Sequence, residues 1–368
     1  MGERAAAAII DGTRLVPLDF SELDGWRDDD HAAAFAAFRQ GATVLARHPP
    51  RGRALGVDGA RLAAILRRAA SLPPDVEIAE ARAFFEAEFS AFELRPPTGG
   101  AFFTGYYEPV VEGSLTPTPE FRVPLHRPPA DLVEIAPGSV PGLDPTFRFA
   151  RRTAEGLAEH PDRGAIMKGG IAGRGLELVW LADPVDAFFI HVQGAARIRL
   201  PDGSGLRVTY AAKSGHPYTP IGRVLVEAGA LTAETATMPA IRAWLAAHPE
   251  DARAVMAKNR SYIFFREAPV QNPALGPIAA AKVALTAGRS LAVDRLLHTF
   301  HAPVWIETTL PSGERFNRLT IAQDTGSAIV GPARGDIFFG SGDAAGAIAG
   351  AMRAGGRFVL LMPKDGGQ

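Results

Sequence analysis

The sequence predicts a protein of the α+β class that is mainly β and has two domains. Its 368 residues are enough for about two domains of roughly 150 residues each. Apolar residues first recur at helical spacing and then alternate as in strands, and this change occurs twice along the chain. The 39 glycines and 30 prolines are scattered without a period, as is typical of many turns between strands. We therefore expect two β-barrel-like units, one inserted into the other.

Composition restricts the classes of function. The 39 basic and 40 acidic residues give a formal net charge of −1, so the positive field that binds nucleic acid is missing and no such partner is expected. The absence of cysteine excludes disulfides, thiolate nucleophiles and cysteine-ligated metals. No segment approaches the roughly 18 apolar residues that a membrane span needs. Asp11 interrupts the apolar run near the start, so no complete leader is expected there.

Three helices are predicted before residue 95, each with an acidic cap and apolar residues three or four positions apart. These apolar side chains are expected to pack in the core. The caps and apolar positions are Asp30 with Phe35, Phe38, Ala42 and Leu45; Asp58 with Leu62, Ile65, Leu66 and Ala69; and Asp75 with Ile78, Ala81, Phe85, Phe89 and Phe92.

From about residue 100 the apolar period changes to two. Strands are predicted at 101–113, 176–181, 186–193, 197–200 and 206–211, with a turn at 201–205. Helices return at 221–227, after Thr237 and at 250–258. A second series of strands is predicted at 261–266, 304–310, 318–323, 336–339 and 357–362.

Three aspartates lie at predicted strand ends in the last third of the chain. Asp324 ends one strand and Asp336 opens the next, 12 residues later, so both carboxylates could face one mouth of a barrel. Asp294 closes a further segment. Each of them taken alone is also explained by turn chemistry, because aspartate is favoured at such positions. Asp324, Thr325 and Gly326 match the aspartic-protease tripeptide, but that chemistry needs a second such motif, which the chain lacks.

Six segments in the same order carry a resemblance to a known family. Five of them are TGYYEP at 104–109, DAFFIHVQG at 186–194, YAAKSGHPY at 210–218, IGRVL at 221–225 and SYIFF at 261–265. The sixth is the C-terminal part with Asp294, Asp324 and Asp336. From about Thr104 to Leu361 the chain resembles the membrane-bound lytic murein transglycosylase A family, whose C-terminal domain is named for three aspartates.

The resemblance implies a lytic transglycosylase that cleaves the β-1,4 bond between N-acetylmuramic acid and N-acetylglucosamine and leaves 1,6-anhydromuramic ends. It implies a double-psi β-barrel domain at 1–108 and 259–368, a smaller inserted β-domain at 109–258, and a glycan groove between them. The catalytic acid falls on Asp336. No metal or organic cofactor is expected, and the sequence contains no HExxH-like pattern.

The same resemblance implies partners and a location. Peptidoglycan glycan strands are the expected partner, other cell-wall enzymes stay open as partners, and a monomer is expected. The expected location is the periplasm, or the periplasmic face of the outer membrane of a Gram-negative bacterium, although no leader is visible in the chain.

The expected chemistry suits a single acid. Hydrolytic glycosidases need two carboxyl groups, because one protonates the leaving oxygen and the other attacks or activates water. In a lytic enzyme the C6 hydroxyl of the muramic sugar is the nucleophile, so one acid that gives and later takes a proton suffices. Burial beside Phe338 and Phe339 and the charge of Asp324 would raise the pKa of Asp336. Alternatively, Asp324 orients backbone amides.

Further residues are candidates for holding the glycan, with packing or a solvated loop as the alternative for each. Tyr106 and Tyr107 point in opposite directions if extended, so at most one faces a sugar. If 186–193 is a strand, Phe189, His191 and Gln193 share its less apolar face, and His191 is not expected to be catalytic. The loop after residue 212 offers several donors to sugar groups. The candidate substrate-binding residues are Thr104, Tyr106, Tyr107, Gln193, Lys213, Ser214, His216, Tyr218 and Asp294.

Two other functions remain open. A non-catalytic cell-wall glycan-binding protein of the expansin-like barrel type would hold glycan without cutting it, and it would need no acid at the centre of its site. An aspartic hydrolase would be sensitive to pepstatin.

Overall fold

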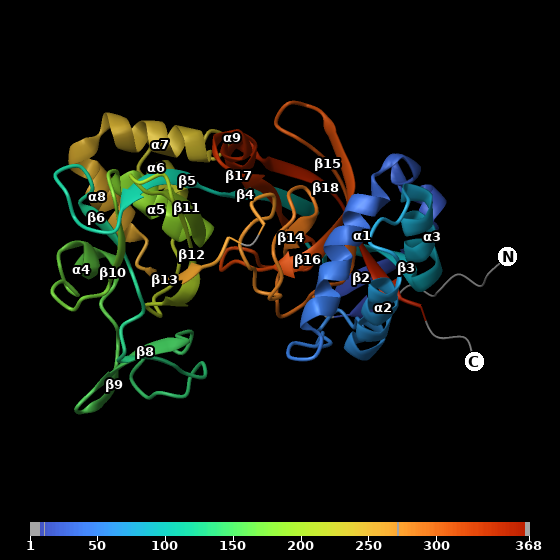
Figure 1. Cartoon of the computed structure of the whole chain (residues 1–368), viewed down its shortest axis with the longest axis horizontal. Coiled ribbons are helices and arrows are strands. Elements are labelled where there is room, and N and C mark those ends of the chain that lie inside the picture. The colour runs from blue at the N-terminus through green and yellow to red at the C-terminus, as the bar shows by residue number, and fades with distance from the viewer. Residues whose placement is uncertain (1–7, 11, 271, 365–368) are drawn as a thin grey trace. The chain divides into compact units, whose positions relative to one another are not determined.

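The computed structural model describes residues 8–10, 12–270 and 272–364, which form an α+β fold that is mainly β, as predicted (Figure 1). The expectation about a leader depends on residues 1–7 and 11, which lie outside the described residues. The chain divides into two compact units. Unit 1 contains the described residues up to 107, 272–340 and those from 344 onward; unit 2 contains 108–270 and 341–343.

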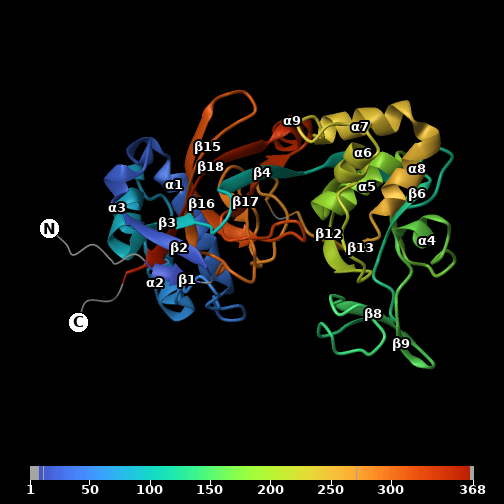
Figure 2. The same cartoon turned by 180° about the vertical axis from the view of Figure 1, so that it is seen from behind.

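The second domain boundary lies later in the chain than the predicted position between 258 and 259. Residues 259–270 belong to unit 2 because the strand β13 (Ile263–Ala268) pairs with β12 (Gly205–Lys213) of that unit. The two strands lie side by side in both views (Figure 1, Figure 2).

The N-terminal part of unit 1 is helical, and two of the three predicted caps are confirmed. Asp30 accepts a hydrogen bond from Ala33 N at the start of α1 (His31–Arg39), and Asp58 accepts from Ala60 N at the start of α2 (Gly59–Ser71). Short 3-10 helices cover Phe20–Glu22, Trp26–Asp28 and Gln40–Val44.

The third helix is shorter than predicted. The helix α3 (Ile78–Glu88) begins after Glu77 rather than Asp75, and Phe89 and Phe92 lie on the strand β3 (Phe89–Arg95). Pairing of β3 with two strands distant in sequence outweighs the local helical spacing of these aromatics. Similarly, Ala42 lies in a 3-10 helix, and Leu45 follows it.

A nine-stranded sheet forms the rest of unit 1, in the order β1-β2-β3-β18-β15-β16-β14-β17-β4. Because β4 also pairs with β18, the six strands from β18 to β4 form a closed circuit of pairings. Trp305, Phe103 and Phe358 are among the large side chains that fill its core. The bounds are β1 (Ala8–Ile10), β2 (Thr13–Leu18), β4 (Ala101–Glu108), β14 (Ser290–Ala292), β15 (Pro303–Thr309), β16 (Arg315–Asp324), β17 (Arg334–Ser341) and β18 (Arg353–Pro363), with α9 (Asp343–Ala351) before β18.

Unit 2 combines a six-stranded sheet, a three-stranded sheet and five helices. The six-stranded sheet has the order β13-β12-β11-β5-β10-β6. Its remaining strands are β5 (Val110–Ser114), β6 (Val123–His126), β10 (Glu177–Leu181) and β11 (Ala195–Arg199), and the smaller sheet contains β7 (Leu132–Glu134), β8 (Phe149–Thr153) and β9 (Gly156–Ala158). The helices are α4 (Arg163–Met167), α5 (Pro184–Gln193), α6 (Ile221–Glu227), α7 (Met238–Ala247) and α8 (Pro249–Lys258).

The predicted strand at 186–193 is wrong, because this segment is the helix α5. Asp183 caps it by accepting from Val185 N at 2.7 Å, Pro184 occupies its first turn, and Gly194 ends it with φ of 79°. Phe188, Phe189, Ile190 and His191 are all buried. A short segment buried on most sides has no clear period, so alternation was a misleading signal here.

A buried ion cluster lies where β5 and β11 meet in unit 2. Glu108 is fully buried and accepts from Arg207 Nε at 2.6 Å and from Arg197 Nε at 2.7 Å. Ser341 Oγ donates to the same carboxylate at 2.7 Å. In the described ranges, no helix is both long enough and apolar enough to cross a bilayer.

Candidate active site

Asp324 and Asp336 flank one short strand in unit 1. Asp324 is the last residue of β16, and Asp336 is the third residue of β17. The strand β14 pairs with both, and its Ala292 is in register with each aspartate. At a strand spacing of about 4.8 Å, the two Cα atoms are roughly 10 Å apart, so the carboxyl groups influence each other without direct contact.

Asp336 is held by a short chain of hydrogen bonds. Thr104 Oγ1 of β4 donates to Asp336 Oδ1, and Arg334 Nη2 donates to Thr104 Oγ1 at 2.7 Å. Since the Thr104 oxygen accepts from the guanidinium, its single proton is directed to Asp336. The Asp336 side chain is half-buried, so it combines a fixed orientation with access from solvent.

The electrostatic surroundings raise the pKa of Asp336 toward neutrality. Burial raises the pKa of Asp336 to about 6; the Arg334 charge and the Thr104 hydrogen bond act in the opposite direction, and Asp324 adds to the rise. The predicted apolar neighbour Phe338 lies two residues away on the same strand and is fully buried. Its ring packs against Tyr106 at a centroid distance of 5.3 Å.

Asp324 accepts hydrogen bonds from one side chain and one backbone amide outside its own strand. Tyr106 Oη donates to Asp324 Oδ2 at 3.0 Å, and Ala280 N donates to Oδ1 at 3.2 Å. Burial raises the pKa of Asp324, while the hydrogen bonds from Thr325, Ala280 and Tyr106 moderate the rise. Burial and the two carboxylates raise the pKa of Tyr106 well above its usual value. Asp324 therefore orients a backbone amide and also acts on Asp336 by charge.

Tyr107 and Asp294 lie in structural positions of unit 1. Tyr107 is buried, and its ring packs where a side chain at Gly346 of α9 would otherwise stand. Asp294 accepts from Leu296 N and from Gly331 N, each at 2.9 Å. Its carboxylate thus connects the loop after β14 to the loop between β16 and β17.

The other candidates lie in unit 2. Gln193 ends α5, Lys213 ends β12 and Tyr218 lies before α6. Ser214 and His216 are buried: Ser214 Oγ accepts from Tyr262 N at 3.1 Å, and His216 Nε2 lies 2.6 Å from the carbonyl of His160. The structure therefore brings together four of the predicted residues, which are Thr104, Tyr106, Asp324 and Asp336.

Arg334 was missed by the sequence reasoning. It precedes Asp336 by two positions on one strand, so the alternation that assigns faces also places both side chains on the same face. Its guanidinium lies over the Phe102 ring, at 5.1 Å from the centroid. Among the described residues no group of three or more His, Cys, Asp or Glu is arranged to hold a metal.

Fold and site together define an α+β protein with two neighbouring carboxyl groups, Asp324 and Asp336, on its nine-stranded sheet. Residues 102–266 match the MltA specific insert domain, and residues 289–362 match the 3D domain. The chain is 46% identical to a membrane-bound lytic murein transglycosylase from Agrobacterium tumefaciens, whose crystal structure superposes with a TM-score of 0.88 over 95% of this chain and 97% of that one.

Two further relatives agree. MltA from Neisseria gonorrhoeae is 29% identical with a TM-score of 0.80, over 100% of this chain and 97% of that one. Membrane-bound lytic murein transglycosylase A of Escherichia coli (strain K12) is 30% identical over 273 residues, which are 73% of this chain and 67% of the relative. The chain belongs to the membrane-bound lytic murein transglycosylase A family, as its motifs predicted, and is an enzyme of the lytic transglycosylase class.

Proposed function

We propose that the protein cleaves the β-1,4 bond between N-acetylmuramic acid and N-acetylglucosamine in peptidoglycan and leaves 1,6-anhydromuramic ends, with Asp336 as its acid and base. The observation that carries the proposal is the half-buried Asp336, whose pKa is raised to about 6 and whose Oδ1 is fixed by Thr104. Such a pKa lets one carboxyl group donate and accept a proton within the same cycle.

The reaction follows from these contacts in two steps. Thr104 engages Oδ1, so Oδ2 carries the proton and gives it to the glycosidic oxygen while the bond from that oxygen to C1 of the muramic sugar breaks. The Asp336 carboxylate then takes the proton of the C6 hydroxyl as O6 bonds to C1. The proton balance closes, water is not consumed, and Asp336 returns to its acid form.

The neighbouring groups favour the protonation state of Asp336 that each step needs. Asp324 favours the protonated form of Asp336 before the first step, and Arg334 favours the carboxylate that exists between the steps. Tyr106 orients Asp324 and holds it at the site. Gln193, Lys213 and Tyr218 of unit 2 remain proposed contacts to the glycan.

A wall-glycan binder without activity is the alternative function. Binding alone gives no reason for an acid whose pKa is raised toward neutrality, because protonation would only remove a charge from the site. Asp336 and its support by Thr104 and Arg334 therefore favour the enzyme.

The fold and location that the family implies are part of the proposal. The closed circuit from β18 to β4 fits a double-psi β-barrel, since it contains both a parallel and several antiparallel pairings. We place the protein in the envelope of a Gram-negative bacterium, at the periplasm or the periplasmic face of the outer membrane, because its relatives are named membrane-bound.

Product analysis tests the chemistry. Purified peptidoglycan is digested with the protein, and the muropeptides are analysed by mass spectrometry before and after borohydride reduction. We expect anhydromuramic ends, which resist reduction. Reducible ends in the products would show hydrolysis and contradict the lytic mechanism, while absence of cleavage with retained glycan binding would favour the binding protein.

A further inference from the structure

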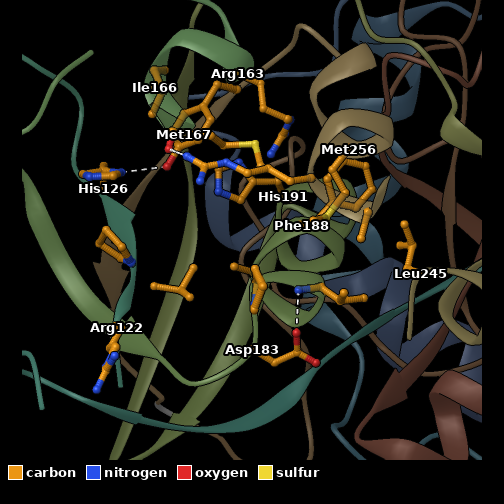
Figure 3. Close-up of a pocket in the computed structure, with 18 of the residues that line it drawn as sticks. Arg122, His126, Arg163, Ile166, Met167, Asp183, Phe188, His191, Leu245 and Met256 are labelled. Carbon is orange, nitrogen blue, oxygen red and sulfur yellow. Dashed lines mark hydrogen bonds between the residues drawn. The ribbon is translucent and has the colours of Figure 1, made fainter. Parts of the chain in front are cut away.

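A cavity of about 1010 Å³ lies within unit 2, whereas the four residues of the candidate active site belong to unit 1 (Figure 3). Its walls come from α4, α5, α7, α8 and the strand β6. Its volume is in the upper part of the range typical of small-molecule sites. The residues of the cavity have no role in the proposed function.

One wall of the cavity contains a buried cation without an acidic partner. Arg163 is 3% exposed and donates from Nε to the Asn259 carbonyl at 3.0 Å and from Nη2 to the Ser261 carbonyl at 2.7 Å. Within the described residues it forms no ion pair with a carboxylate; burial lowers the pKa of Arg163 to about 10, and Tyr262 and Tyr218 act in the opposite direction. Its guanidinium has five N–H donors, so donors remain beyond these two bonds.

Aromatic rings fix the direction of this guanidinium. It lies 4.8 Å from the centroid of the Phe188 ring and 5.3 Å from that of Tyr262. Both rings also line the cavity. Burial of a cation is costly unless a negative group neutralises it, so the unused donors at Arg163 fit an anion.

Neutral donors accompany Arg163. Ile263 N donates to His191 Nδ1 at 3.1 Å, and a backbone N–H can only donate, so the neutral His191 ring carries its proton on Nε2. Burial and the neighbouring Arg163 hold the pKa of His191 well below its usual range. Burial also lowers the pKa of His126 to about 4, and its Nδ1 lies 2.7 Å from Tyr262 Oη.

The rest of the cavity is largely apolar. Ile166, Met167, Phe188, Leu245 and Met256 line it beside Arg163, as the close-up shows (Figure 3). Methionine side chains adapt to the shape of an apolar ligand. A glycan would instead need many polar partners, so these walls do not fit a sugar chain.

Several of the other charges around the cavity have partners of their own. Arg242 pairs with Asp186 at 2.8 Å, and Arg253 donates to the Met167 carbonyl. Asp183 caps α5, and Glu177 acts on the pKa of His126 but not on that of Arg163. The lining contains four arginines and two acids, so an anion meets a net positive surface.

We propose that this cavity binds an amphiphilic carboxylate, with the carboxylate at Arg163 and an apolar chain against Met167, Leu245 and Met256. The carboxylate accepts from the unused guanidinium donors and replaces the missing counter-charge. A medium-chain fatty acid has this chemistry, and decanoate is therefore the probe.

Calorimetric titration of the full chain tests the site with three probes. Decanoate has both features, acetate has only the charged group, and decylammonium has the same chain length with the opposite charge. We expect one decanoate site, with an affinity at least about tenfold higher than for either other probe. Equal binding of decanoate and decylammonium, or no binding of decanoate at millimolar concentration, would overturn the proposal.

Two variants locate the carboxylate. Arg163→Met keeps an unbranched apolar side chain and removes the charge, and it should lower decanoate affinity about tenfold and remove the preference over decylammonium. Arg199→Met is the matched control, because Arg199 lies outside the cavity lining and pairs with the exposed Glu112. Unchanged affinity in a folded Arg163→Met protein would contradict the assignment.

A measurement on the unaltered protein covers the case in which Arg163→Met does not fold. A decanoate analogue with a diazirine at the chain end is photolysed with the full chain, and the labelled peptides are identified by mass spectrometry. We expect labels in α4, α7 or α8, on peptides with Met167, Leu245 or Met256. Labels confined to other parts of the chain would overturn the proposal.

Discussion

Thr104 donates its hydroxyl proton to Asp336 because its oxygen already accepts a hydrogen bond from Arg334 at 2.7 Å. The three side chains come from β4 and β17, which are neighbours in the nine-stranded sheet. In Asp336, Oδ1 is therefore occupied by Thr104. Oδ2 is the oxygen that gives and takes the proton in the proposed reaction.

Replacing Asp336 by asparagine should abolish most cleavage without loss of glycan binding. The amide keeps size and most hydrogen bonds but has no acidic proton, so turnover of peptidoglycan should fall by about 10²–10⁴-fold, as for loss of a general acid–base group. Turnover of peptidoglycan and binding of a chitin oligomer are measured on the same preparation. In the control Asp294→Asn, the expected loss is in thermal stability, because the Asp294 carboxylate accepts hydrogen bonds from two loop amides, Leu296 N and Gly331 N. Near-normal turnover by folded Asp336→Asn would show that the acid is misassigned.

Removal of the Arg334 charge should shift the alkaline limit of activity to higher pH. The first step needs protonated Asp336, so kcat/KM should fall as the pH rises through about 6. Arg334 lowers the pKa of Asp336, hence Arg334→Met raises that pKa and moves the limit upward. A pH profile of kcat/KM measures the shift, and Arg334→Lys, which keeps the charge, should restore most of the original profile. A profile that moves downward in Arg334→Met would contradict this account.

Loss of the Asp324 charge should shift the limit in the opposite direction. Asp324 raises the pKa of Asp336, so Asp324→Asn lowers that pKa and moves the alkaline limit to lower pH. Tyr106→Phe should produce a smaller shift of the same sign. The tyrosine hydrogen bond favours the Asp324 carboxylate, and its loss leaves that carboxylate less charged. Identical pH profiles of kcat/KM in wild type and Asp324→Asn would show that Asp324 does not raise the pKa of Asp336.

Glu108→Gln should destabilise unit 2 strongly. The change leaves Arg207, which is 3% exposed, without its acidic partner, and breaking a buried ion pair costs about 3–5 kcal/mol. Denaturant unfolding followed by circular dichroism measures the loss. The matched control is Glu112→Gln, whose pair with Arg199 is exposed, so its effect should stay within about 1 kcal/mol. Equal effects of the two variants would show that the buried cluster adds no special stability.

The acids of the site could be predicted from the sequence, because a strand end followed by a glycine-rich loop limits where an aspartate can point. Their partners could be predicted less well. Thr104 lies more than 200 positions before Asp336, and the pairing of β4 within the nine-stranded sheet brings them together. Arg334 was within reach of the same alternation argument but was not considered.

The errors in the fold have a common physical origin. Phe89 and Phe92 have helical spacing but lie on β3, because β2 and β18 pair with that strand on either side. In the segment 186–193 apolar and less apolar residues alternate in the sequence, yet the segment forms α5. The cap at Asp183, the proline after it and Gly194 set the ends of this helix. In both cases the outcome depends on partners or caps outside the pattern that was considered.

The pairing of β18 with β3, β4 and β15 has a consequence for how the enzyme matures. Ala91 and Leu361 are partners although 270 positions separate them, so this part of unit 1 has a high contact order and its closure is intrinsically slow. Unit 2 lies wholly between those partners in sequence. Thr104 and Asp336 both lie on strands of the closed circuit, so catalytic competence emerges only when the circuit is complete. Regain of activity during refolding should therefore follow the completion of this circuit in unit 1.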